Sequence, residues 1–285
     1  MMRLKDPSLN FEKIIDECCL GICGNQILLD KVVKSRGYLV SQGISYLESG
    51  AKGELHLIPA IDSTNDKDPI VNDDLRRSDL VKVYDQYFVG GNKPARKMYD
   101  SLLSSAKEQC PFCGGIGVPR NLDHFLPKAH FPQFSVFPRN LIPACRDCNM
   151  DGKGQKFSKN AEDQIIQPYL DDDRFFKEQW IFCKYNFGVG SIPGDFEYFT
   201  AAPNGWADIE KKRAAKHFSD FNLARRYGIK AAERLGSVLL QMEILKAKNL
   251  HAEINSIVLQ PPIDSAPFPN HWSVGMHQAL IKALS

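Results

Sequence analysis

Apolar residues recur at helical spacing through the first part of the chain, with one polar interruption. Between residues 10 and 47, the segments "FEKIIDECC" and "QILLDKVVKSRGYLVSQGISYL" alternate apolar and polar positions in a way that predicts two or three helices. Residues 61–79 are polar, acidic and rich in turn formers, so they predict a loop or linker. Residues 90–109 begin with two glycines and a proline that suits a first turn, and their apolar stripe predicts another helix.

The second half of the chain changes from strand-like to helical patterning. "EQWIFCKYNF" and "DFEYFTA" are rich in aromatic residues and predict two strands, joined by a turn over residues 188–195. Residues 208–249 are strongly helical and predict one long helix or a helix pair. Together these patterns predict an α+β protein that is mostly helical.

Length and charge refine this picture only locally. With 285 residues, the chain is near the upper limit for one hydrophobic core, so two units or one core with an inserted module are both reasonable. The net charge of +2 does not indicate a nucleic-acid binder. Residues 93–160, however, hold eleven Lys and Arg against five Asp and Glu, a local charge of +6. Such a patch is typical of phosphate binding, and a solvated basic surface is the alternative.

The sequence also indicates a compartment. No signal peptide is visible, and nothing approaches 18 consecutive apolar residues, so we expect no membrane span. In a reducing cytosol, paired Cys-x-x-Cys units hold metal more often than they form disulfides. We therefore expect a cytoplasmic protein.

Two Cys-x-x-Cys pairs are the strongest local signal. Cys110 and Cys113 form the first pair and Cys145 and Cys148 the second, with 31 residues between them. This spacing predicts four thiolates around one zinc ion, each about 2.3 Å from the metal. Four cysteine ligands leave no open position, so the zinc should be structural. A rubredoxin-like iron site fits the same ligands and stays open as an alternative.

The enclosed residues suit phosphodiester hydrolysis. A neutral imidazole at His124 can accept a proton from the attacking water. Mg²⁺ prefers oxygen ligands and keeps several waters, and Asp123 and Asn149 can supply a carboxylate and an amide oxygen, with Mn²⁺ as an alternative ion. Adjacent residues of a strand point to opposite faces, so we expect a bend or bulge between Asp123 and His124.

The remaining polar residues of this segment complete the predicted site. Asn140 begins "NLIPAC" and is expected to clamp the loop or to orient the His124 ring. Arg146, Lys153 and Lys156 are expected to hold nucleic-acid phosphates.

These motifs together resemble the HNH family of ββα-metal nucleases. Members with two zinc knuckles carry C-x2-C, Asp-His-x-x-Pro, Asn-Leu-x-x-x-Cys-x-x-Cys-Asn and a lysine, and this chain has "DHFLP" and "NLIPACRDCN" in that order. The resemblance covers about fifty residues and implies a β-hairpin and a helix that grip one catalytic metal. It implies that His124 is the general base, that Asp123 and Asn149 are metal ligands, and that Asn140 supports the catalytic loop. Lys153 stands four residues after Asn149, where three is usual.

The wider sequence resembles HNH proteins of bacterial anti-phage systems, with the HNH subunit of Zorya-type defence as one candidate. We therefore expect an N-terminal helical region (1–92), a zinc-bound HNH module (93–160) and a mainly helical C-terminal region (161–285). The predicted function is a metal-dependent DNA endonuclease with other defence-system subunits as partners. The alternatives are a zinc-knuckle nucleic-acid-binding or adaptor module without catalysis, and an electron-transfer protein.

Overall fold

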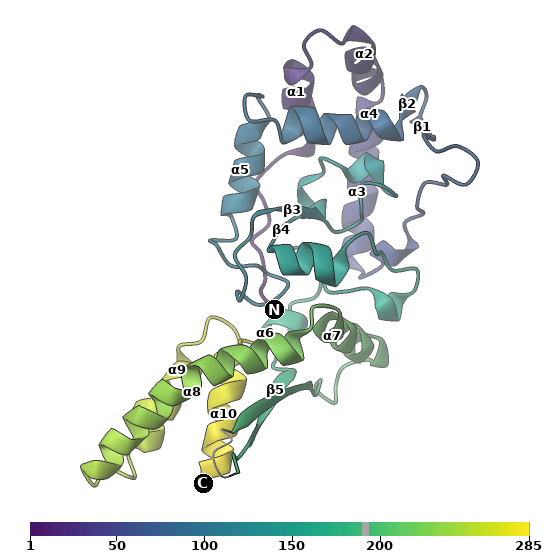
Figure 1. Cartoon of the computed structure of the whole chain (residues 1–285). Helices are drawn as coiled ribbons and strands as arrows, with labels where there is room; N and C mark the ends of the chain where they lie inside the picture. The colour runs from purple at the N-terminus through teal and green to yellow at the C-terminus, as the bar shows by residue number, and fades with distance from the viewer. Residues whose placement is uncertain (190–193, 285) are drawn as a thin grey trace. The chain divides into compact units, whose positions relative to one another are not determined.

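The computed structural model describes residues 1–189 and 194–284, which form two compact units (Figure 1). The first unit comprises Arg3–Asp172, and the second comprises Met1–Met2 with Asp173–Ser285. About half of the described residues are helical, and each sheet among them is a two-stranded antiparallel pair. The α+β class predicted from the sequence is confirmed. The boundaries expected after residues 92 and 160 stay predictions.

Three helices open the first unit, as the apolar spacing predicted. Their bounds are α1 (Phe11–Gly21), α2 (Gln26–Lys34) and α3 (Arg36–Ala51). The side chains of Asn10 and Asn25 accept hydrogen bonds from the N–H groups of Lys13 and Leu28, and so fix where α1 and α2 begin. A short turn, η1 (Leu55–Leu57), follows α3.

The loop predicted over residues 61–79 is only partly present. Its second half forms a small hairpin, β1 (Ile70–Asn72) and β2 (Leu75–Arg76), and then α4 (Arg77–Lys82) begins. Asp73 has a φ of 50°, which closes the turn, and Leu75 is fully buried. The acidic turn residues predicted a loop correctly at that point, but burial of Leu75 orders the flanking residues.

Two further elements lead to the cysteine pairs. The π-helical segment η2 (Val83–Phe88) follows α4, and α5 (Arg96–Ser104) is the helix predicted over residues 90–109. It ends earlier than predicted because Lys107 and Glu108 both have positive φ, which a helix does not accommodate.

A hairpin lies at the centre of this unit (Figure 1). Strand β3 (Asn121–His124) pairs with β4 (Leu141–Ala144), α5 packs against both strands, and η5 (Asp147–Lys153) follows β4. Between the strands lie two short turns, η3 (Pro132–Phe134) and η4 (Pro138–Asn140). The ring of Tyr46 in α3 lies 4.9 Å from that of Phe134, and these aromatic contacts attach the loop between the strands to the N-terminal helices. The turn η6 (Ala161–Asp163) comes after η5.

The second unit is built on the predicted aromatic hairpin. After α6 (Arg174–Lys177), strand β5 (Ile181–Asn186) pairs in register with β6 (Asp195–Thr200). The predicted turn between them includes residues 190–193, which lie outside the described residues. Helix α8 packs against β6 and α10 against β5. At Gly275 in α10, a Cβ would lie 2.9 Å from the Tyr198 ring, so glycine permits this close approach.

The helical segment predicted over residues 208–249 is a pair of helices rather than one. The break falls at Asn222, whose φ is 50°. The helices of this region are α7 (Asp208–Asp220), α8 (Leu223–Ala247), η7 (Asn255–Leu259), α9 (Pro261–Asp264) and α10 (Trp272–Leu284). Among the described residues, no helix has both the length and the apolar character needed to cross a membrane.

Candidate functional site

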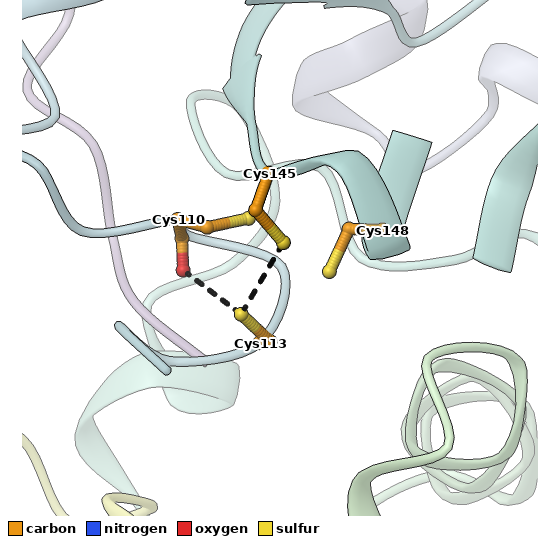
Figure 2. Close-up of side chains that lie close together, drawn as sticks. All are labelled: Cys110, Cys113, Cys145 and Cys148. Carbon is orange, nitrogen blue, oxygen red and sulfur yellow. Dashed lines mark hydrogen bonds between the residues drawn. The ribbon is translucent and has the colours of Figure 1, made fainter. Parts of the chain in front are cut away.

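The two Cys-x-x-Cys pairs meet in one buried cluster. Cys110 and Cys113 lie in the loop after α5, Cys145 directly follows β4, and Cys148 lies in η5 (Figure 2). The four sulfur atoms lie within 4.8 Å of one another, and those of Cys113 and Cys145 are 4.0 Å apart. A tetrahedral zinc with Zn–S bonds of about 2.3 Å separates its sulfurs by about 3.8 Å. The cluster therefore has the donor type and the spacing that zinc requires.

Local backbone geometry explains the first half of the cluster. Gly114 and Gly115 have φ values of 62° and 84°, which turn the chain back after Cys113. The N–H of Gly117 then donates to the Cys113 sulfur at 3.3 Å. Hydrogen bonding with the Cys110 thiol lowers the pKa of Cys113. None of the eight cysteines, all of which lie within the described residues, forms a disulfide.

The hairpin between the cysteine pairs is regular. Its four pairs run from Asn121 opposite Ala144 to His124 opposite Leu141 without a shift in register. The bend or bulge that we expected between Asp123 and His124 is therefore wrong for this ladder. His124 is the last residue of β3, and its side chain and that of Asp123 line the same cavity although they alternate along the strand.

His124 is buried and held in one tautomer. Its Nε2 lies 2.8 Å from the Ser135 carbonyl oxygen, which can only accept, so Nε2 carries the hydrogen and Nδ1 the free lone pair. The Tyr84 ring packs against the imidazole at 4.4 Å between centroids, at an angle of 66°. Burial lowers the pKa of His124 to about 3, so the ring is neutral at pH 7.

Asp123 and Lys153 form a buried ion pair. Their side chains are 7% and 3% exposed, and Lys153 Nζ lies 3.6 Å from Asp123 Oδ2. The same Oδ2 atom makes no hydrogen bond. Burial raises the pKa of Asp123 to about 6, although Lys153 opposes this shift, and burial lowers the pKa of Lys153. Asp123, which lines the cavity described below, thus has a buried carboxylate oxygen that makes no hydrogen bond.

Asn149 completes the group that the sequence predicted. It lies in η5, and its Nδ2 donates to Asn121 Oδ1 at 3.1 Å, which fixes the orientation of the amide. Asp123, His124 and Asn149 all line one cavity of about 510 Å³. Three residues that are up to 26 positions apart in sequence are thus brought to one place by the hairpin and η5.

Asn140 is fully buried and ties the loop to the N-terminal helices. Its Oδ1 accepts from the Tyr46 hydroxyl at 3.1 Å and from the Leu126 N–H at 2.7 Å. Its Nδ2 donates to the carbonyl oxygens of Leu126 and Phe134 at 3.0 and 3.2 Å. These contacts support the clamping role that we expected, and none of them reaches the His124 ring.

We predict that Asn140→Ala lowers the free energy of unfolding of the first unit by at least about 3 kcal/mol, because buried donors and acceptors lose their partners. All three tryptophans lie in Asp173–Ser285, so hydrogen exchange of β3 and β4 amides is the suitable measurement. Asn160→Ala is the control, since Asn160 is exposed and its loss should cost less than about 0.5 kcal/mol. Equal exchange in the two variants would contradict the clamp.

The predicted phosphate-binding residues lie in different settings. Arg146 and Lys156 are exposed, whereas Lys153 is buried against Asp123. None of the three lines the cavity. Sequence reasoning also missed Tyr84 and Lys128, which do line it. No sequence feature points to Tyr84, because no local pattern relates η2 to a hairpin about forty residues later. Lys128 could have been found, because it directly follows the motif "DHFLP".

Comparison with known proteins relates nearly the whole chain to one other protein. It is 35% identical to protein ea31 of Escherichia phage lambda over an alignment 293 positions long, which spans 98% of this chain and 97% of that protein. The chain belongs to the ea31 family. This family relationship spans both compact units, so the second unit is part of the shared protein and not an addition to it.

A shorter similarity connects this ea31-family chain to a second protein. Septu protein PtuB of Bacillus thuringiensis is 29% identical over 109 residues, which cover 36% of this chain and 41% of PtuB. No family model matches the chain. No solved structure matches it either.

Proposed function

We propose that this protein is a metal-dependent endonuclease of the HNH type, which hydrolyses DNA phosphodiester bonds. One observation carries the proposal: Asp123, His124 and Asn149 line a single cavity on a hairpin and short helix that a four-cysteine cluster joins. The order of strand, strand and helix agrees with the ββα arrangement that the sequence resemblance implies. A protein that only carried electrons would need the cysteines and none of the other three residues.

The residues of the cavity fit a hard divalent cation. Asp123 Oδ2 is buried and makes no hydrogen bond, and an ion such as Mg²⁺ prefers a carboxylate and an amide oxygen as ligands. Asp123 and Asn149 would hold it, and the hydrogen bond from Asn149 Nδ2 to Asn121 leaves the amide oxygen available as a ligand. When bound, the cation supplies positive charge that stabilises the departing 3′ oxygen.

His124 is assigned the proton transfer. With Nε2–H donated to Ser135, its Nδ1 is the atom that would take the proton from the attacking water. A pKa of about 3 keeps the imidazole neutral but makes it a weak base. A phosphodiester bound beside the ring brings negative charge, which would raise this pKa toward the useful range.

The proposed substrate is inferred from the local positive charge, and the proposed biological role from the similarity to PtuB. Arg146 and Lys156 are exposed and belong to the locally positive segment of residues 93–160, so phosphate contacts would supply most of the affinity for DNA. The similarity to Septu protein PtuB, a defence-system component, supports a role in anti-phage defence with further subunits as partners. The narrower expectation of a Zorya-type subunit stays a prediction.

We expect the purified protein to nick supercoiled plasmid in the presence of Mg²⁺ and to leave it intact when Mg²⁺ is omitted. A single module of this kind cuts one strand at a time, so open circles should precede linear DNA, and the products should carry 5′-phosphates. Gel electrophoresis of timed samples measures both forms. Omission of Mg²⁺ is preferable to a strong chelator, which would also remove the structural metal.

Zinc content measured in both samples is the control, since it must be the same with and without added Mg²⁺. Equal cutting without any divalent cation would contradict the assignment of Asp123 and Asn149. DNA binding that needs no Mg²⁺, combined with no nicking under any condition, would favour the alternative of a zinc-stapled binding module without catalysis.

A further inference from the structure

Lys128 brings a positively charged side chain to the cavity. Of the described residues that line the space around Asp123, His124 and Asn149, it is the only lysine or arginine. The ammonium group of Lys153 is nearby, but its side chain is 3% exposed and pairs with Asp123. Among the described side chains that line the cavity, Lys128 is therefore the lysine or arginine that can contact a bound phosphate group.

Two contacts hold the Lys128 ammonium in place. It donates a hydrogen bond to Asp85 Oδ1, and it lies 4.4 Å from the centroid of the Tyr84 ring. Tyr84 is itself fixed, because its hydroxyl donates to the Leu122 carbonyl at 3.3 Å and its ring packs on His124. One aromatic ring thus positions both the imidazole and the ammonium group, and little side-chain entropy is left to lose when Lys128 binds an anion.

A positively charged group in the cavity offsets the negative charge of its carboxylates. Asp85 and Asp123 both line it, so a phosphodiester would enter a space that already holds two carboxylates. The Asp85 side chain is 51% exposed, whereas that of Lys128 is 26% exposed. The Asp85 carboxylate can therefore be solvated at little cost when another anion replaces it as the partner of Lys128.

We propose that Lys128 binds the substrate phosphate next to the scissile bond, and that this phosphate replaces the Asp85 carboxylate as the partner of the ammonium. Lysine is a common phosphate ligand, and a charge-assisted hydrogen bond to phosphate is stronger than a neutral one. Because one anion replaces another, the ammonium is never left unpaired during the exchange. The inference rests on the proposed function and names the residue that recognises the phosphodiester at that site.

The test measures binding of a fluorescein-labelled DNA duplex by anisotropy, in a His124→Ala parent and without Mg²⁺, so that the DNA stays intact. Lys128→Met should weaken binding about tenfold and reduce the slope of log affinity against log salt by about 0.9, the value for one phosphate contact. Lys128→Arg should retain most of the affinity. Asp85→Asn should tighten binding about threefold, because the phosphate then has no carboxylate to displace.

The matched control is Lys97→Met, which removes a lysine of α5 that pairs with Glu17 of α1 at 3.2 Å and does not line the cavity. Its binding should equal that of the parent. If the parent binds DNA, unchanged affinity in Lys128→Met or weaker binding in Asp85→Asn would overturn the inference. A parent that binds no DNA at any salt concentration would overturn the proposed function and this inference with it.

Discussion

Replacing His124 with alanine should abolish phosphodiester cleavage while zinc content and overall fold are retained. General base catalysis contributes about 10²- to 10⁴-fold to rate, so we expect nicking to fall at least about a hundredfold. The Ser135 carbonyl loses its donor in this variant, which costs about 1–3 kcal/mol of stability. The assay should therefore run well below the melting temperature, with circular dichroism and zinc analysis to verify the fold.

His130→Ala is the matched control for this loss. His130 lies six residues later, is half-buried, packs its ring 4.9 Å from that of Phe157 and does not line the cavity. We expect it to nick plasmid at close to the wild-type rate. A His124→Ala protein that cuts as fast as the wild type would show that the assigned base is wrong.

Replacing Cys110 with serine should release the structural metal and unfold the segment from Cys110 to Lys153. Serine does not supply the thiolate that completes the tetrahedron, and a structural zinc site contributes about 10–16 kcal/mol of apparent binding free energy to local folding. The hairpin β3–β4 and η5 would lose the contact that joins their ends, so cleavage should be lost with them. Elemental analysis measures the metal, and hydrogen exchange measures the segment.

Cys18→Ser is the control that separates loss of the metal from the loss of stability caused by burying a serine hydroxyl in the core. Cys18 is also fully buried, in α1, but it lies outside the cluster. It should lower stability and keep a full complement of metal. A stable, active Cys110→Ser protein would contradict the structural role, and iron in place of zinc in the wild type would favour the rubredoxin-like alternative.

Local patterns explain what sequence reasoning predicted well. The helices α1 to α3 and the strands β5 and β6 were predicted because apolar spacing and aromatic content reflect neighbouring positions. The convergence of the four cysteines was also predictable, since two tight pairs at this spacing satisfy one metal. The chemical roles expected of Asp123, His124 and Asn149 stay predictions, and the structure places the three residues around one cavity.

Contacts between distant segments explain what it missed. The hairpin β1–β2 depends on the burial of Leu75, which no local pattern signals. Lys153 was expected to face nucleic acid, but the structure buries it against Asp123, 30 positions earlier. Tyr84 and Asp85 come from a segment to which the sequence assigned no role, and only folding brings them to Lys128.

The sequence by itself determined the α+β class, the four cysteines that could hold a metal ion and the residue types that the proposed phosphodiester chemistry needs, because each is a property of composition or short spacing. The tertiary structure alone decided which charged groups lie together: Lys153 pairs with Asp123, and Lys128 contacts both Asp85 and the Tyr84 ring. The physical reason is that burial and electrostatic pairing depend on distance in space, and Tyr84 and Asp85 reach Lys128 because η2, a segment remote in sequence, packs against β3.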